Sequence, residues 1–186
     1  MAPFSIATAF SDKLFGGNPA AVIFLDTSLP FEELAKIARN LNQPVLVVVS
    51  PTSLASDESE NEESRIERRS IRFISRRGDL EPAVCGHGTL VATKVMFDLP
   101  EVKASKICFE TTSGEHLEAI RLEEGWFEIE IPAITPVDVD DDEKKRLKGY
   151  VDEAFGRDVK VNDIKTGRNT IYHTCKILRF ALIIDP

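Results

Sequence analysis

The sequence lacks several features that would direct it to a particular environment or partner. It has no excess of basic residues, because 23 lysines and arginines stand against 31 aspartates and glutamates and leave a net charge of −8. Binding to nucleic acid needs a basic face, so nucleic acid is not expected as a main partner. No apolar run is long enough to cross a membrane, and no basic N-terminal region precedes an apolar one. We therefore expect a cytoplasmic protein with no membrane partner.

Cysteine and histidine are scarce and scattered. The three cysteines, Cys85, Cys108 and Cys175, are widely spaced and contain no C-x-x-C pair. An odd number with this spacing does not form a disulfide framework, and no two candidate ligands have the spacing of a zinc site. We therefore expect no metal. Cys108 lies in an alternating apolar run and is expected to be a packed thiol.

Hydrophobic residues make up 42% of the 186 positions, which is enough to bury a core in one medium domain or two small ones. Periodicity predicts mixed strands with two helices before residue 132, and hence an α+β domain. One helix is expected between a cap at Thr27 or Ser28 and Pro44, and another begins near Gly88. A hairpin is expected around Gly16-Gly17-Asn18-Pro19. The expected strands cover residues 4–10, 20–25, 45–49, 71–75, 107–111, 116–122 and 126–131.

Two segments differ from the rest in composition. Ser53 to Glu63 is rich in serine, aspartate and glutamate, which predicts a disordered acidic insertion near residues 53–69, most simply a solvated loop without a role. Pro132 to Asp142 is a proline-containing acidic connector. We therefore expect a first domain over residues 1–133 and an incomplete second domain over residues 134–186. In the second, we expect one helix followed by one or two strands over residues 171–184.

The segment Cys85-Gly86-His87-Gly88-Thr89 is the most informative part of the chain. It places a thiol, an imidazole and a hydroxyl on a turn that opens a predicted helix. The start of a helix offers unpaired N–H groups and a positive dipole end, which suit a small carboxylate. A histidine beside that carboxylate can move protons near neutral pH. This pattern predicts a site for binding and proton transfer.

Three segments together resemble the PhzF-like family of phenazine-biosynthesis proteins, which are related in fold to diaminopimelate epimerase. Ala9 to Val22 is similar to the opening motif of that family, Cys85 to Leu90 to its cysteine–glycine–histidine motif, and Phe109 to Gly114 to a third motif. Three motifs in order are more specific than any one of them. The resemblance covers about residues 5–131.

The resemblance implies a fold of two similar halves, each a curled mixed sheet around a central helix, with the active site between them. Members are isomerases or epimerase-like proteins, and the phenazine enzyme moves a proton without metal or organic cofactor. This implies an isomerase that needs no cofactor and acts on a small carboxylate-bearing metabolite. The helix after His87 would be the central helix of the first half.

The sequence departs from the family pattern at three places. Gln43 falls where the family has its catalytic glutamate, and an amide cannot accept and return a proton at neutral pH. The alternative is that Gln43 is only an exposed residue at a helix end. Ile74-Ser75 replace a usual threonine–proline pair, and Glu81 is expected to be an ion-pair partner rather than a replacement base. Most of the second half, with the family's catalytic aspartate, has no counterpart, so we expect a truncated fold.

Each candidate site residue also has a plain structural interpretation. His87 stands between two glycines at a helix start, where little core is available, so function is favoured. Cys85 is either a base, as in the related epimerases, or a small buried thiol. Thr89 is either a ligand or a helix cap. Backbone N–H groups of the remaining candidates either hold a substrate carboxylate or form tight turns; these are Gly16, Gly17, Asn18, Gly86, Gly88, Ser113 and Gly114.

Three functions follow from this sequence. The first is a proton-transfer isomerase in a biosynthetic pathway, with His87, Cys85 and the position of Gln43 as its catalytic residues. The second is a catalytically impaired remnant that binds a metabolite or pairs with another subunit, since an incomplete domain leaves an apolar face for a homodimer. The third is a redox-sensing thiol protein using Cys85, which ranks last because no resolving cysteine lies nearby.

Overall fold

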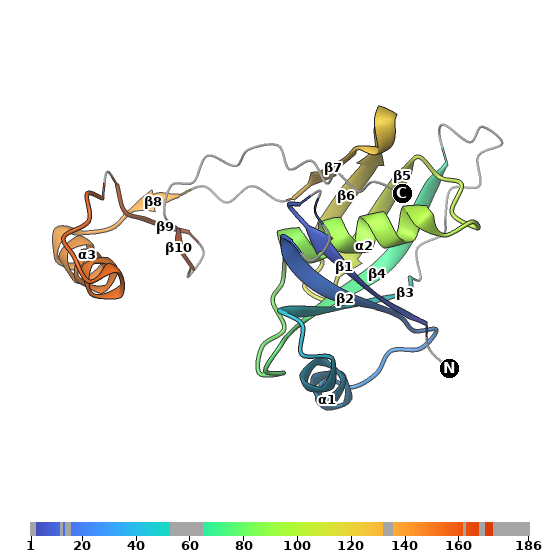
Figure 1. Cartoon of the computed structure of the whole chain (residues 1–186), viewed down its shortest axis with the longest axis horizontal. Helices are drawn as coiled ribbons and strands as arrows, with labels where there is room; N and C mark the ends of the chain where they lie inside the picture. The colour runs from blue at the N-terminus through green and yellow to red at the C-terminus, as the bar shows by residue number, and fades with distance from the viewer. Residues whose placement is uncertain are drawn as a thin grey trace. The chain divides into compact units, whose positions relative to one another are not determined.

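The computed structural model describes residues 3–11, 13, 16–52, 65–131, 136–161, 163–167 and 170–172. These residues form two compact units, one before and one after the break between residues 132 and 133, and each is described by itself (Figure 1). Residues 53–64 of the expected acidic insertion lie outside the described residues. Residues 66–69 of that insertion are strand, so the end of the insertion was placed too late. The assignment of residues 134–186 as a second family domain stays a prediction.

The first unit is built on one mixed sheet of seven strands that lie in chain order. Strands β2 and β3 are parallel, as are β4 and β5, and all other neighbours are antiparallel. The expected hairpin is confirmed as the β1–β2 pair. The strands are β1 Phe4–Ala9, β2 Asn18–Phe24, β3 Val45–Pro51, β4 Ile66–Ser75, β5 Lys106–Thr111, β6 His116–Arg121 and β7 Phe127–Glu130.

Two helices make the two parallel crossovers. Helix α1 (Phe31–Leu41) joins β2 to β3, and helix α2 (Gly86–Asp98) joins β4 to β5. Crossover connections between parallel strands are nearly always right-handed. Strands β2 and β4 run in opposite directions, but both crossovers move in the same direction across the sheet. The two helices must therefore cover opposite faces, as the two hydrophobic clusters and Figure 1 show.

The sheet curls around α2. This helix contacts β1, β2 and β3 near one edge and β6 and β7 at the other. Nine of its thirteen residues are buried, because sheet surrounds the helix on several sides. Phe97 of α2 stacks on Phe127 of β7 with ring centroids 5.4 Å apart, which ties the helix to the far edge. The expected α+β fold, a curled mixed sheet around a central helix, is thereby confirmed.

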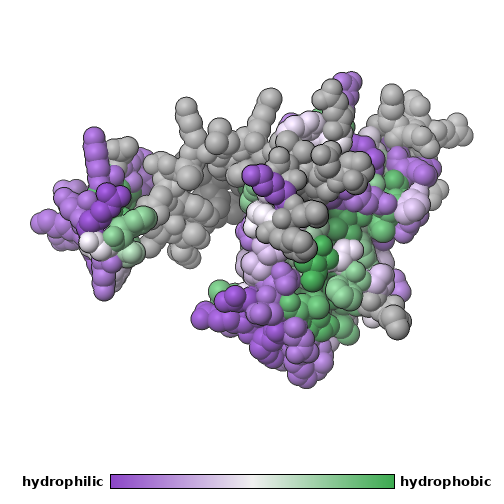
Figure 2. Space-filling view, in the orientation of Figure 1, coloured by the Kyte–Doolittle hydropathy of each residue, from purple (hydrophilic) through white to green (hydrophobic). Residues whose placement is uncertain are grey.

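Strand β3 lies between the two helices, as its uninterrupted apolar run Val45 to Val49 predicts. Val45, Val47 and Val49 pack toward α2, whereas Leu46 and Val48 pack toward α1. Successive side chains of β3 therefore contribute in turn to the hydrophobic core under α2 and to the one under α1. Figure 2 shows the hydrophilic surface of α1 and, beside it, hydrophobic surface in the part of the view where β1 and β2 lie.

One expected helix start was wrong, and the other was displaced by two residues. Helix α1 begins at Phe31 with Pro30 as its N-cap residue and has no capping side chain, so neither Thr27 nor Ser28 is the cap. Helix α2 begins at Gly86, two residues before the expected Gly88, with Cys85 in the N-cap position. For α1 the side-chain signal for a cap was misleading, and the difference of two residues at α2 is within the usual uncertainty of a helix boundary.

The second unit is a small sheet with one helix. Strands β8 (Val137–Asp138), β9 (Lys165–Gly167) and β10 (Thr170–Tyr172) accompany helix α3 (Asp141–Phe155). Asp140 caps α3 by accepting from the Glu143 N–H at 2.8 Å, and Gly156 ends it in the left-handed conformation. Leu147 is the one buried residue of α3. The strands expected beyond Tyr172 lie outside the described residues. None of the helices described here has the length and apolar character needed to cross a membrane.

Candidate functional site

The topology brings the separated candidate segments to one end of the sheet. Strands β2 and β3 start at this end, whereas β4 and its parallel neighbour β5 finish there. Helix α2 starts after the loop that follows β4, and it must therefore begin at the same end. The end thus collects the β1–β2 turn with Gly16 to Asn18, Gln43, the start of α2 with Cys85 to Thr89, and the β5–β6 turn with Ser113 and Gly114.

Gln43 stands at the junction of α1 and β3. Helix α1 stops at Asn42, whose positive φ of 53° turns the chain, and Pro44 accepts a hydrogen bond from the Arg76 N–H at 3.2 Å. Extending the β2–β3 register back by three residues brings Asn18 level with Gln43. The half-buried Gln43 side chain donates through Nε2 to the Leu41 carbonyl at 3.1 Å. The turn therefore holds the Gln43 side chain in part, and the amide oxygen and the second N–H can still bind a ligand.

The start of α2 is held close to the sheet because Gly88 has no side chain. A Cβ there would lie 3.1 Å from Val47 Cγ2 and 3.2 Å from Phe73 Cδ1, both in the buried sheet. A Cβ on Gly86 would meet nothing within 4 Å. Gly88 thus serves close packing, and Gly86 leaves the first turn of the helix open. The N–H groups of that turn have no carbonyl partner within the helix.

Thr89 lies inside the first turn of α2 and does not cap the helix. It is fully buried, and its hydroxyl donates to the Cys85 carbonyl at 2.9 Å, one turn back within the helix. The Thr89 N–H donates to the same carbonyl, also at 2.9 Å. The side chain therefore reinforces the first turn of α2. Of its two interpretations, the cap is therefore excluded, because the helix begins before Thr89.

Cys85 and His87 form a close pair at this helix start. Cys85 Sγ lies 3.4 Å from His87 Nδ1. Burial raises the pKa of the Cys85 thiol, and the nearby Gly88 N–H offsets part of this increase. The Cys85 side chain does not form a capping hydrogen bond at this helix start. Burial also lowers the pKa of His87. Both groups are therefore held neutral near pH 7, as a thiol beside a neutral imidazole.

The other ring nitrogen of His87 is buried without a partner. Among the residues that the structure describes, no group forms a hydrogen bond with His87 Nε2. A buried nitrogen in this state costs free energy unless something else binds it. Within the same described residues, no group of three or more histidine, cysteine, aspartate or glutamate side chains is placed to hold a metal ion.

The two turns beside the helix start differ in how much room they leave. Gly17 has a positive φ of 74°, and a Cβ there would lie 2.1 Å from the Ala9 carbonyl oxygen. Gly114 has a similar φ of 79°, with nothing within 4 Å of a Cβ. The hydroxyls of Thr111 and Ser113 lie 2.9 Å apart, so the Ser113 hydroxyl already has a partner. The β5–β6 turn is therefore internally bonded, with open space around Gly114.

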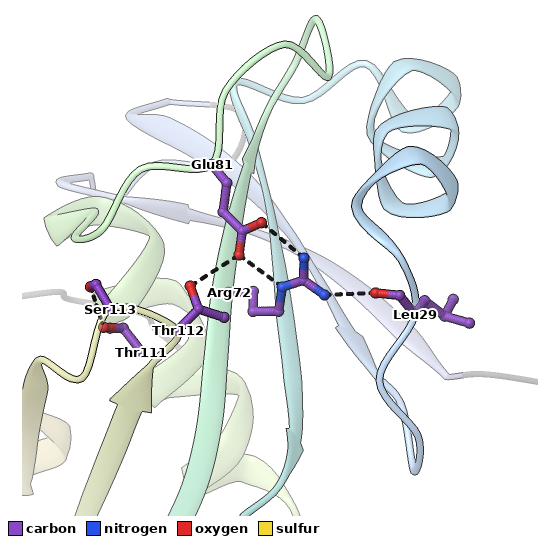
Figure 3. A network of polar contacts seen from close by, with 6 residues as sticks. All are labelled: Leu29, Arg72, Glu81, Thr111, Thr112 and Ser113. Carbon is purple, nitrogen blue, oxygen red and sulfur yellow. Dashed lines mark hydrogen bonds and ion pairs between the residues drawn. The ribbon is translucent and has the colours of Figure 1, made fainter.

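A polar network on the α1 face fixes the loop that leads into α2 (Figure 3). Arg72 binds Glu81 through two hydrogen bonds of 2.8 Å and donates to the Leu29 carbonyl at 2.7 Å. Thr112 adds a hydrogen bond to Glu81 at 3.2 Å. The expectation that Glu81 is an ion-pair partner is confirmed. Hydrogen bonding to Arg72 lowers the pKa of Glu81, which further argues against its use as a base at neutral pH.

Sequence reasoning did not anticipate Arg72, Leu29 and Thr112 as parts of this network. One signal was available for Arg72, because it stands between Ile71 and Phe73, which face α2, and so must face α1. Its contact with the Leu29 carbonyl joins residues 43 positions apart and had no local signal. Cys85 packs against the α2 core, so this network and the Cys85–His87 pair lie at different faces of the sheet.

Comparison with known proteins gives consistent results. The family model described as phenazine biosynthesis-like protein matches residues 7–176. The chain is 35% identical to the mouse phenazine biosynthesis-like domain-containing protein 1, over 66% of this chain and 40% of that protein. It is 27% identical to an uncharacterized isomerase of Halalkalibacterium halodurans, over 72% of this chain and 44% of that protein.

The same fold occurs in a solved structure. The crystal structure of a PhzF-family phenazine biosynthesis protein from Enterococcus faecalis matches with a TM-score of 0.64 and 24% identity. The match covers 90% of this chain and 55% of that one. The chain therefore spans about half the length of the proteins that it matches.

Proposed function

This chain belongs to the phenazine biosynthesis-like protein family, and from that premise we propose that it carries the site of a proton-transfer isomerase. Its substrate would be a small metabolite with a carboxylate group. The observation that carries this proposal is the meeting, at one end of the sheet, of the start of α2 with the β1–β2 turn and Gln43. A relative named as an isomerase supports the reaction class.

Each segment has a chemical role in this proposal. The open first turn of α2 at Gly86 and the turn around Gly17 and Asn18 supply N–H groups for the carboxylate. His87 acts on the proton that moves, and its neutral state at pH 7 leaves one ring proton that it can share with the substrate. The reaction as proposed uses no metal and no organic cofactor.

Gln43 favours a second function, binding without turnover. A carboxylate at this position could take a proton from a substrate carbon and return it, whereas the amide cannot. General acid–base catalysis contributes roughly 10²–10⁴-fold to rate. With one N–H bonded to the Leu41 carbonyl, the Gln43 amide offers a ligand its oxygen and its second N–H, but no group that can remove a proton. The chain would then hold a metabolite or pair with a partner subunit.

Isotope exchange separates these two functions. The chain is incubated in D₂O with a panel of cyclic and amino-acid-like carboxylates, and deuterium entering carbon-bound positions is followed by NMR. Exchange by the native chain that is lost in His87→Gln but kept in His116→Gln supports the isomerase. Exchange only in a Gln43→Glu variant supports the impaired site, with Gln43 in the position of the base. Exchange that His87→Gln leaves unchanged would contradict the role proposed for His87.

We also propose that the chain pairs with a second copy of itself in the cytoplasm. Strand β1 is an edge of the sheet as described, and it carries no charge, no proline and no bulge to protect that edge. Its Phe4 and Ile6 side chains are 58% and 51% exposed. The opposite edge, β7, carries Glu128 and Glu130. An uncharged edge is suited to antiparallel pairing with an identical uncharged edge.

A further inference from the structure

Either Cys85 or His87 could be the donor in the hydrogen bond between them. The distance from Sγ to Nδ1 is 3.4 Å, which is within the range of a hydrogen bond that involves sulfur. Either the thiol proton points at the imidazole, or an imidazole proton points at the sulfur. Sulfur is a weak acceptor, whereas the unprotonated nitrogen of a neutral imidazole is a good one. The thiol is also a weak donor, so the two arrangements compete, and one of them has the thiol donating and Nδ1 accepting.

The surroundings of the sulfur favour the arrangement in which the thiol donates. The Gly88 N–H lies near Cys85 Sγ and directs positive charge toward the sulfur lone pairs. The thiol proton is then best placed away from that N–H, and Nδ1 is the acceptor that lies within reach among the described residues. The pair is partly buried, which reduces the competition of water for the thiol proton.

If Nδ1 accepts, the single proton of the neutral ring must be on Nε2. Nε2 is buried and has no partner within the described part of the chain. Within the described residues the ring therefore carries a donor without a protein acceptor, and a ligand or water would satisfy it. An oxygen acceptor, such as a carboxylate or a carbonyl, is the chemical class that would bind it.

We propose that Cys85 is a positioning residue, which donates to Nδ1 and holds His87 with its proton on Nε2, ready to donate to a ligand oxygen. His87 would then meet its ligand as a hydrogen-bond donor and a potential acid, and not as the base. The role in ligand binding rests on the proposed function, but the protonation pattern of the ring is a property of the free chain.

The test is ¹⁵N NMR of the full chain labelled at histidine, recorded at pH 8 without ligand, with His87→Gln to assign the signals of His87. The native chain should show a protonated Nε2 and an unprotonated Nδ1. Cys85→Ala should redistribute the proton over both nitrogens. Cys85→Ser, which keeps a donor at this position, should retain the native pattern. Cys108→Ala removes a buried thiol elsewhere and should change nothing at His87.

Two outcomes would overturn the proposal. One is a native chain with the proton on Nδ1, which would make the sulfur the acceptor. The other is a native pattern that persists in a folded Cys85→Ala variant, since the thiol would then have no influence on the ring. This NMR test needs no ligand and no turnover, so the protonation pattern of His87 can be found even where the exchange experiment detects no activity. A failure of this proposal is therefore distinguishable from a failure of the proposed function.

Discussion

Arg72 shows how one side chain can organise segments that are distant in the chain. Its guanidinium binds Glu81 at two atoms and the Leu29 carbonyl at a third, and both ionic side chains are about four-fifths buried. Bidentate charged hydrogen bonds of this kind are stronger than exposed ion pairs. The pair therefore fixes the loop before Cys85 relative to β4 and the approach to α1.

We expect Glu81→Gln to lower the free energy of unfolding by roughly 1–3 kcal/mol at pH 7, because it removes charge-assisted hydrogen bonds from a partly buried arginine. Glu33→Gln, which breaks the exposed ion pair with Lys36, should cost less than about 1 kcal/mol. Urea unfolding of the two variants and the native chain measures both changes. Equal losses in the two variants would show that the Arg72–Glu81 pair acts as an ordinary surface contact.

The stability contribution of Glu81 should also depend on pH. Its pKa in the folded chain is lowered, mainly by the hydrogen bonds to Arg72, so its contribution is present above the pKa of the unfolded chain. The contribution is lost as pH falls below the ordinary glutamate value of about 4.3 and through the lower folded value. The difference in unfolding free energy between the native chain and Glu81→Gln should therefore shrink on acidification. A difference that stays constant down to pH 3 would contradict this linkage.

At the scale of elements, the candidate site residues lie in turns and at the start of a helix. The sequence predicted the turns more accurately than the helix starts. The glycine–glycine–asparagine–proline segment predicted the β1–β2 turn correctly, because few other local structures suit those residues. The start of α2 was expected two residues late, and Thr89, one candidate for a cap, has a hydroxyl that bonds back within the helix. Strands β8 and β9 were missed, since two or three residues hold too short a pattern to detect.

Gly17 and Gly114 allow a matched test at this scale. Both have positive φ, so alanine at either position meets the left-handed penalty of roughly 1–2 kcal/mol. Only Gly17→Ala also places a Cβ 2.1 Å from the Ala9 carbonyl oxygen. Thermal unfolding should therefore show a larger loss for Gly17→Ala than for Gly114→Ala. Similar losses would mean that the hairpin can shift to admit the methyl group.

At the scale of the whole molecule, periodicity predicted the α+β class, and the family resemblance added the curled sheet around a central helix. Local patterns located most strands, but the parallel pairings of β2 with β3 and of β4 with β5 join segments separated by a whole helix. Those pairings decide which segments meet at one end of the sheet. The site could therefore be listed as residues from sequence, whereas its assembly around α2 and the network of Arg72 required the structure.

The unprotected edge of β1 gives the last prediction. Paired antiparallel with a second copy, β1 would cover the exposed Phe4 and Ile6 side chains and complete the hydrogen bonds of the edge. Ile6→Lys places a charge at the centre of that pairing, and we expect it to weaken self-association at least about tenfold, or ~1.4 kcal/mol. Leu80→Lys changes an equally exposed apolar residue in a loop and should leave association unchanged. Sedimentation equilibrium over a range of concentrations measures both variants. A native chain that stays monomeric throughout, or equal weakening by both substitutions, would exclude β1 as the pairing edge, because only Ile6 lies on that strand.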